Sequence, residues 1–267
     1  MIPKVINYCW FGKNPLPESA IKCIESWKKY CPDYKIVQWN EDNYDVNKNQ
    51  YMANAYKEKK WAFVSDYARI DIIYNHGGVY FDTDVELVAS LDQFLGDGLF
   101  CGWENRDPLL DIIGQPYENS VAFGLGFGAE AGHPVLKKIL DTYEKISFYN
   151  SDGTLNLVAC PRYQTAALCQ FGLNTTERTY QKLKNAVIYP EDYFSPKSIL
   201  TGKINITTNT VAIHHFSMSW VDSETKKLHD IEWALCKKMN YQYAKRITKI
   251  IGIPLKIKRK VRQICKK

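Results

Sequence analysis

The feature that most constrains this chain is an acidic pair that directly follows a short apolar segment. Gly77 and Gly78 favour a turn, residues 79–81 are apolar and predict a short buried strand, and Asp82 and Asp84 come next. Side chains two residues apart in an extended backbone point to the same side, so we expect the two carboxylates to face one point. Two like charges held together are costly unless a cation lies between them. The sequence therefore predicts a site for a hard divalent ion that prefers oxygen ligands.

The rest of the chain alternates predicted strands and helices, which indicates an α/β protein. Apolar segments predict strands over residues 4–10, 34–39, 79–81, 86–88, 91–95, 99–103, 187–190 and 210–216. Amphipathic spacing predicts helices over residues 18–31, 61–75, 135–149 and 163–171. The order strand, helix, strand at the N-terminus indicates a parallel βαβ unit. We expect one domain over residues 1–232 and a separate basic helical tail over residues 233–267.

The predicted helix over residues 61–75 carries an unusual polar stripe. Ser65, Asp66 and Arg69 lie one turn apart on one face. Taken alone, the stripe predicts a surface ion pair worth less than about 1 kcal/mol. Because Asp82 and Asp84 follow, Arg69 is also a candidate partner for phosphate, whose oxygens guanidinium binds in two-point geometry.

Charge is distributed unevenly along the chain. The 267 residues contain 35 Lys and Arg and 29 Asp and Glu, yet no acidic residue follows Glu232 and 12 basic residues lie between Lys237 and Lys267. The preceding part has 23 basic and 29 acidic residues, a formal charge of −6. Gly252 and Pro254 are expected to divide the tail into two amphipathic helices. We expect the tail to bind an anionic membrane surface; the alternatives are a disordered basic tail and, without any accompanying motif, nucleic acid.

The cysteines and the apolar segments limit the class of protein further. Eight cysteines are present without a CxxC pair, which argues against a zinc knuckle. No secretory signal follows Met1, and no apolar run reaches the roughly 20 residues that a membrane span needs. We therefore expect free thiols and a cytoplasmic location, peripheral on the inner face of the membrane.

Four sequence blocks in order resemble glycosyltransferase family 32, the group with a DXD sugar-binding region that includes capsular polysaccharide synthesis enzymes and initiating α-mannosyltransferases. The blocks are Ile6 to Gly12, Ser65-Asp66-x-x-Arg69, Gly77 to Asp84, and the late His-His-Phe-x-x-Ser-Trp segment from His214 to Trp220. The resemblance covers residues 2 to about 225. More distantly, the blocks are similar to the large clostridial glucosylating toxins.

The resemblance implies a GT-A fold, which is a Rossmann-like mixed sheet flanked by helices. It also implies a Mn²⁺ or Mg²⁺ ion, a nucleotide-sugar donor that is UDP-linked in preference to GDP-mannose, and transfer with retention to a glycan or lipid-linked saccharide in surface polysaccharide synthesis. The resemblance implies that Trp10 stacks on the base and that Ser65, Asp66 and Arg69 contact the ribose, sugar or phosphates. It places Tyr80 beside the metal motif and implies Asp82, Asp84 and His215 as metal ligands, with His214 as the second candidate for the histidine. It also implies that Ser219 and Trp220 belong to a loop over the diphosphate.

Two other classes compete with this interpretation. A strand followed by Asp-x-Asp is also typical of haloacid-dehalogenase-like phosphohydrolases, in which Asp82 would be the nucleophile. Proteins of that class carry the motif on the first strand of the chain. A carbohydrate-binding module without turnover is the third class, and the combination of Arg69 with both aspartates argues against it. The sequence leaves open whether retention uses a covalent carboxylate, for which Glu118 and Asp222 are candidates by position alone, or attack on the same face guided by the departing phosphate.

Overall fold

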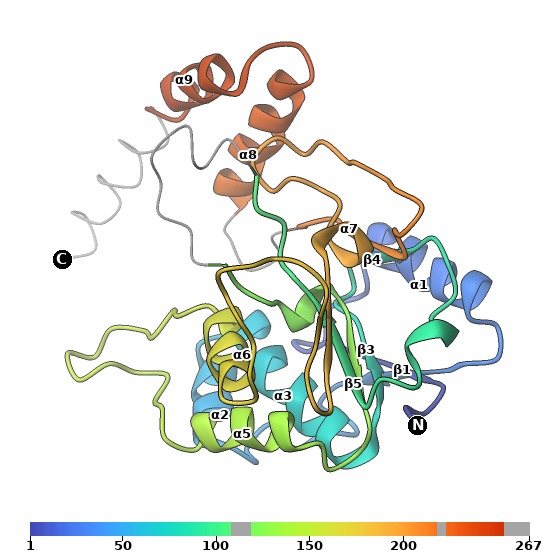
Figure 1. The fold of residues 1–267 in the computed structure, drawn as a ribbon. Coiled ribbons are helices and arrows are strands. Elements are labelled where there is room, and N and C mark those ends of the chain that lie inside the picture. Colours follow the sequence, from blue (N-terminus) through green and yellow to red (C-terminus); the bar gives the residue numbers. More distant parts are fainter. Residues whose placement is uncertain (108–118, 218–222, 254–267) are drawn as a thin grey trace.

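The computed structural model describes residues 1–107, 119–217 and 223–253 of the chain, and it has a seven-stranded mixed sheet at its centre (Figure 1). The strand order is β2-β1-β3-β6-β5-β8-β7. These strands are β1 (Val5–Cys9), β2 (Lys35–Trp39), β3 (Gly78–Tyr80), β5 (Leu99–Gly102), β6 (Phe127–Ala129), β7 (Gln181–Lys182) and β8 (Val187–Tyr189). A two-stranded antiparallel sheet pairs β4 (Val85–Leu87) with β9 (Ala212–His214).

The N-terminal part of the sheet is parallel, as the order of predicted elements indicated. β1 runs parallel to both β2 and β3, whereas β6 runs antiparallel to β3 and to β5. The expected mixed α/β sheet flanked by helices is therefore confirmed. Because β1 and β3 are parallel neighbours, their carboxyl ends meet at one edge of the sheet, and Trp10 follows β1 at the edge where Asp82 follows β3.

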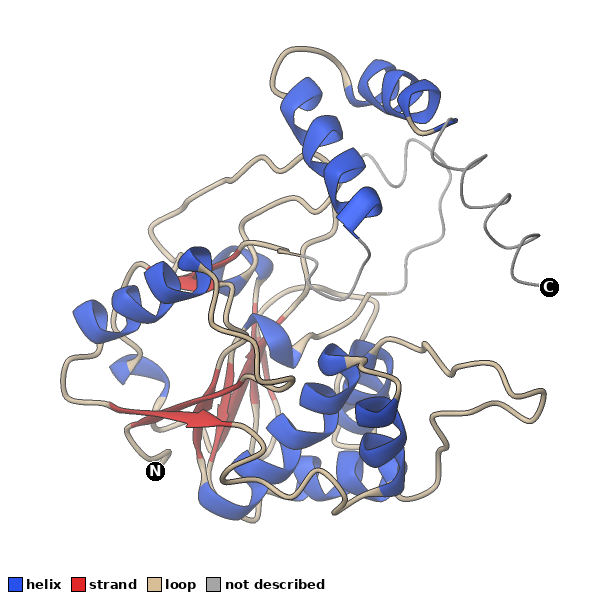
Figure 2. Cartoon of the chain, turned by 180° about the vertical axis from the view of Figure 1, so that it is seen from behind, coloured by secondary structure: helices blue, strands red, loops and turns tan. Residues whose placement is uncertain are grey.

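Helices cover both faces of the sheet, and each face has its own apolar core (Figures 1 and 2). One core includes Met52, Ile70 and Leu136, and the other includes Trp27 and Phe94. The helices are α1 (Glu18–Tyr30), α2 (Gln50–Lys57), α3 (Trp61–His76), α5 (Pro134–Tyr143), α6 (Cys160–Cys169), α7 (Glu191–Phe194), α8 (Ser223–Cys236) and α9 (Tyr241–Ile251), and two 3₁₀ turns are η1 (Asp92–Phe94) and η2 (Phe123–Leu125). The seven cysteines among the described residues are free, as expected.

Several local expectations need correction. The apolar segment 91–95, expected as a strand, contains the 3₁₀ turn η1, because its aromatic side chain Phe94 packs into the second core rather than into a sheet. Helix α2 was not predicted, and α5 ends at Tyr143 rather than near residue 149.

The expected boundary between residues 232 and 233 falls inside helix α8, which contacts the body. The side chain of Trp233 donates from Nε1 to the carbonyl of Ile199 at 3.0 Å, and His229 contacts the same carbonyl through Nε2 at 3.2 Å. A Cβ at Gly202 would lie 2.7 Å from the Trp233 ring, so only glycine lets this ring approach so closely. The beginning of the tail is thus attached to the body through specific contacts.

Candidate active site

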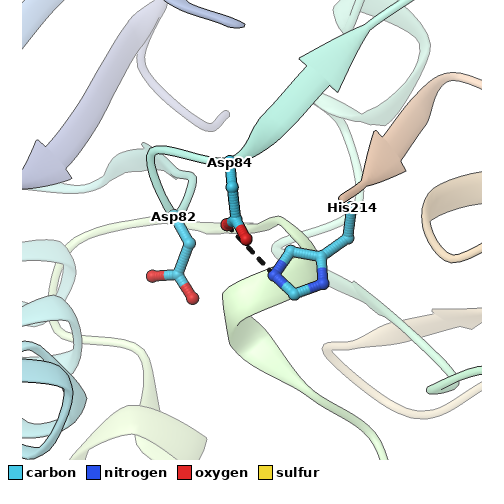
Figure 3. Close-up of side chains that lie close together, drawn as sticks. All are labelled: Asp82, Asp84 and His214. Atoms are coloured by element: carbon cyan, nitrogen blue, oxygen red, sulfur yellow. Dashed lines mark ion pairs between the residues drawn. The ribbon is translucent and has the colours of Figure 1, made fainter. Parts of the chain in front are cut away.

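The acidic pair lies in the turn that joins β3 to β4, at the carboxyl end of β3 (Figure 3). Phe81 donates its backbone N–H to the carbonyl of Asn7 on β1 at 3.1 Å, which continues the sheet up to the turn. We expected an extended strand to orient Asp82 and Asp84. Asp84 instead lies in a turn, in which the backbone N–H of Val85 donates to the carbonyl of Asp82 at 3.1 Å. The turn therefore brings the two carboxylates close together, and strand alternation does not.

His214, at the end of β9, completes a three-residue cluster with the two aspartates. One potential ligand atom from each of Asp82, Asp84 and His214 lies within 4.8 Å of the others. His214 Nε2 is 3.2 Å from Asp84 Oδ1 (Figure 3). Ser217 donates its backbone N–H to the other oxygen of Asp84 at 2.7 Å. Two carboxylates and an imidazole are ligands that Mn²⁺ accepts, and the carboxylates also suit Mg²⁺.

The structure places His214, and not the preferred candidate His215, beside the two aspartates. His214 pairs with Val85 across the small sheet, and successive side chains of a strand point to opposite faces. His215 Nε2 therefore lies 2.8 Å from Glu86 Oε2, on the other side of the strand pair. Its backbone N–H still contacts the acidic turn, donating to the carbonyl of Asp84 at 2.9 Å.

Arg69, on helix α3, connects the polar stripe of that helix to the acidic pair. Its Nη2 lies 3.0 Å from Asp66 Oδ1 and 3.2 Å from Asp82 Oδ1, and its Nε donates to the Ser65 carbonyl at 3.1 Å. Only 5% of its side chain is exposed, so a surface ion pair is the wrong description of this contact. A buried guanidinium held between two carboxylates orients both of them.

Tyr80 forms the other wall of this network. Its hydroxyl donates to Asp82 Oδ1 at 3.0 Å, and the Arg69 guanidinium carbon lies 5.1 Å from the centre of its ring. Tyr80 is buried in the core. The Tyr80 hydroxyl therefore holds the Asp82 carboxylate in its orientation.

The two aspartates differ in their electrostatics. For Asp84, burial would raise the pKa, but the charge and hydrogen bond of His214 and the N–H of Ser217 outweigh burial and hold the pKa well below its usual range. For Asp82, burial and then the charge of Asp84 raise the pKa against the opposing effect of Arg69. Such a separation of pKa values between neighbouring carboxyls is frequent at functional sites.

Two residues of the site were not singled out from the sequence. A Cβ at Gly124 in η2 would lie 2.4 Å from Asp82 Oδ2 and 2.9 Å from Arg69 Nη1, so the backbone itself contacts the acidic pair. Lys197 is 7% exposed; its ammonium donates to the His215 carbonyl at 2.8 Å and lies 4.0 Å from the centre of the Trp233 ring. The glycine-rich composition of residues 121–128 was a signal for Gly124, whereas the sequence around Lys197 offers none.

Trp10 is half-buried, and its Nε1 donates to the Asn14 carbonyl at 2.6 Å. Trp10 lies at the same edge of the sheet as Asp82, and its side chain makes no direct contact with the acidic cluster. Ser65 contributes its carbonyl to Arg69. Ser219, Trp220, Glu118 and Asp222 lie outside the described residues.

Comparison with known proteins finds a family that matches residues 17–100, described as glycosyltransferase sugar-binding region containing DXD motif. Inositol phosphoceramide mannosyltransferase 1 of Schizosaccharomyces pombe (strain 972 / ATCC 24843) is 26% identical over 210 residues, which are 73% of this chain and 60% of the relative. Inositol phosphoceramide mannosyltransferase 3 of the same yeast is 28% identical over 155 residues, 55% of this chain and 38% of that protein. Among solved structures, PaToxG glycosyltransferase is similar with a TM-score of 0.45 and 18% identity, over 63% of this chain and 69% of that one.

The chain thus spans less than two thirds of the length of these two yeast relatives. The matched segment contains α3 and the turn between β3 and β4, and therefore Arg69 and both aspartates. The resemblance expected from the sequence is confirmed over this segment: residues 17–100 match a glycosyltransferase sugar-binding region, and Asp82 and Asp84 lie within the match at the spacing of a DXD motif.

Proposed function

We propose that the protein is a metal-dependent glycosyltransferase that transfers a hexose, with retention, from a nucleotide-sugar to a glycan or lipid-linked saccharide. The observation that carries the proposal is the convergence of a buried guanidinium, two carboxylates and an imidazole at the carboxyl edge of the sheet. In α/β proteins this edge is where ligands bind. The match to a sugar-binding region over the residues that provide three of these four groups supports the proposal.

The cluster fits a divalent ion because its donors are two carboxylate groups and one imidazole, with one ligand atom of each within 4.8 Å of the others. Asp82, Asp84 and His214 would hold the ion. When bound, Mn²⁺ or Mg²⁺ supplies positive charge that stabilises the departing diphosphate. Arg69 holds Asp82 in place and adds a fixed positive charge at the site, and Tyr80 orients the same carboxylate.

The closing test is metal-dependent release of diphosphate from UDP- and GDP-hexoses. We expect Asp84→Asn to bind Mn²⁺ at least about a hundredfold more weakly and to lose turnover, because it removes the carboxylate charge that pairs with His214. Asp42→Asn is the matched control, since Asp42 is exposed and its side chain makes no contact with the cluster. Circular dichroism confirms the fold of each variant. Wild-type metal affinity and turnover in Asp84→Asn would contradict the metal assignment.

The proposal also includes a donor and an acceptor. A UDP-linked hexose is proposed on the resemblance of the segment around Trp10, with GDP-mannose as the second donor, and a lipid-linked or surface glycan is the proposed acceptor. The names of the two yeast relatives, which are mannosyltransferases acting on inositol phosphoceramide, support a hexosyl donor and a lipid-linked acceptor. Calorimetric titration of UDP- and GDP-hexoses in the presence of Mn²⁺ decides between the donors.

The phosphohydrolase alternative is not supported. Asp82 follows β3, the third strand of the chain, instead of the first. One of its oxygens is also engaged by both Arg69 and Tyr80, which leaves it poorly placed to attack a phosphorus atom. Turnover of donor separates the proposed enzyme from a binding module.

We further propose that the protein is cytoplasmic and binds an anionic membrane surface through α9, with no role for nucleic acid. Helix α9 packs on the molecule through Tyr241, Ala244 and Thr248, whereas Tyr243, Ile247, Ile250 and Ile251 form an exposed apolar stripe. Lys245, Arg246 and Lys249 are exposed beside this stripe. Cations beside an exposed apolar stripe match a surface of anionic headgroups over acyl chains. Among the described residues, no helix has the length and apolar character to cross a bilayer.

Vesicle co-sedimentation tests this surface. Ile250→Glu should release the protein from phosphatidylserine-containing vesicles, because Ile250, at 66%, is the most exposed residue of the stripe. Gln242→Glu is the control, since it adds the same charge to the same helix outside the stripe. Equal vesicle binding of both variants would contradict the proposed membrane surface.

A further inference from the structure

A cavity of about 670 Å³ lies between helix α6 and the segment around Ser120. Its walls include Glu104 and Ser120 on one side and Ala159, Arg162 and Thr165 on the other. A space of this size is typical of sites for small organic ligands. Nothing in the chemistry described above uses it.

Two hydrogen bonds connect this cavity to the candidate active site. Thr165, in the cavity wall, accepts the N–H of Val121 through Oγ1 at 3.0 Å. Its chain neighbour Gln164 accepts the N–H of Phe123 through Oε1 at 2.9 Å. Phe123 begins η2, and the next residue, Gly124, contacts Asp82 and Arg69. Helix α6 therefore holds in place the segment that lies against the acidic pair.

The wall also carries a buried polar atom without a partner. Asn119 donates from Nδ2 to the carbonyl of Thr175 at 2.8 Å, and both residues line the cavity, but its Oδ1 has no hydrogen-bond partner. Buried polar groups are normally hydrogen-bonded, so this unpaired acceptor in the cavity wall points to a polar ligand that donates a hydrogen bond. A sugar hydroxyl donates such a hydrogen bond.

We propose that this cavity binds the acceptor saccharide, through a hydroxyl group that donates to Asn119 Oδ1. The proposal rests on the proposed function, because an acceptor requires a donor site nearby. In the transfer, the bond between the anomeric carbon and the diphosphate oxygen breaks, and its electron pair leaves with the diphosphate. The acceptor oxygen forms the new bond to the anomeric carbon, and its proton leaves with the diphosphate. Asn119 positions the acceptor and exchanges no proton.

The test fills the cavity without changing the acidic cluster. Ala166→Trp places an indole in the cavity from an exposed helical position, and Gln170→Trp, exposed just after the same helix, is the matched control. Saturation-transfer NMR measures binding of methyl α- and β-glycosides of glucose, galactose, mannose and N-acetylglucosamine, with UDP and Mn²⁺ present. Metal-dependent hydrolysis of the nucleotide-sugar, with water as the acceptor, is measured in parallel.

We expect at least one glycoside to bind the wild type and the Gln170→Trp variant, and its signal to fall at least about tenfold in Ala166→Trp. Hydrolysis should stay within about twofold of wild type in all three proteins. Binding by Ala166→Trp at the wild-type level, or binding of no glycoside by the wild type, would overturn the acceptor assignment. Absence of hydrolysis in every protein, with glycoside binding lost only in Ala166→Trp, would instead refute the proposed function and leave the saccharide site standing.

Discussion

The close approach of the Gly124 backbone to Asp82 offers a sharp test of the site. Gly124 has a backbone conformation that any residue can adopt, so its glycine is not required by strain. An alanine at this position would clash with the site, because its Cβ would lie 2.4 Å from Asp82 Oδ2 and 2.9 Å from Arg69 Nη1. Ordinary van der Waals contacts of a Cβ begin at 3.4 Å.

The size of the effect follows from these distances. The Asp82 carboxylate must withdraw by about 1 Å in a closely packed environment to accept the new methyl group. It is held by Arg69 at 3.2 Å and by the Tyr80 hydroxyl at 3.0 Å, so the displacement also disturbs both contacts. A misplacement of about 1 Å in a catalytic group costs on the order of a hundredfold in rate, or about 2.7 kcal/mol of transition-state stabilisation.

The assay compares Gly124→Ala with Gly96→Ala, because a Cβ at Gly96 meets nothing within 4 Å and its backbone is equally unstrained. Calorimetry measures Mn²⁺ affinity, and diphosphate release from the nucleotide-sugar measures turnover. We expect Gly124→Ala to fold and to lose about a hundredfold in turnover, whereas Gly96→Ala keeps wild-type values. Wild-type Mn²⁺ affinity and turnover in Gly124→Ala would refute the proposal that Asp82 must occupy its observed position.

Three further predictions concern the charged groups around the cluster. Arg69→Met should lower the free energy of unfolding by about 3–5 kcal/mol in urea denaturation, because it leaves the buried carboxylates of Asp66 and Asp82 without their cation. An unchanged urea midpoint would contradict the stabilising role of these ion pairs. Lys197→Met should weaken Mn²⁺ binding by about tenfold in calorimetry, because it removes the hydrogen bond that holds the His215 carbonyl. Lys203→Met, at an exposed position, is the control. Equal Mn²⁺ affinities of the two variants would contradict a contribution of the Lys197 contact to metal binding. Burial lowers the pKa of His214, but Asp84 raises it more, so the pKa lies above its ordinary 6.5. In metal-free protein, this ion pair should therefore add stability that is fully present below pH 6.5 and is lost as pH rises through the raised pKa. Thermal unfolding in EDTA measures the trend, which His214→Gln should abolish; the same pH dependence in that variant would assign it to another group.

Local sequence patterns determined the elements that carry the site. Helix α1 forms almost where the apolar spacing predicts, because its buried residues recur every three to four positions and so share the face that packs on the sheet. The stripe of Ser65, Asp66 and Arg69 was visible because neighbours on a helix face are set by the helix alone. The DXD motif was visible for the same reason, since it lies within one short segment.

Expectations failed where distant segments decide the outcome. His214 and His215 are equivalent in sequence, and only the register of β9 against β4, more than 120 residues away, assigns His214 to Asp84 and His215 to Glu86. The same holds for Lys197, whose role depends on β9 and α8 meeting around it.

The sequence by itself determined the acidic pair, its arginine and the α/β order of elements, because each of these depends on residues a few positions apart. Only the tertiary structure decided which histidine joins the pair, why position 124 is glycine, and where α6 leaves a cavity beside the site. Strand register and close packing between distant segments govern those features, and no local pattern encodes them.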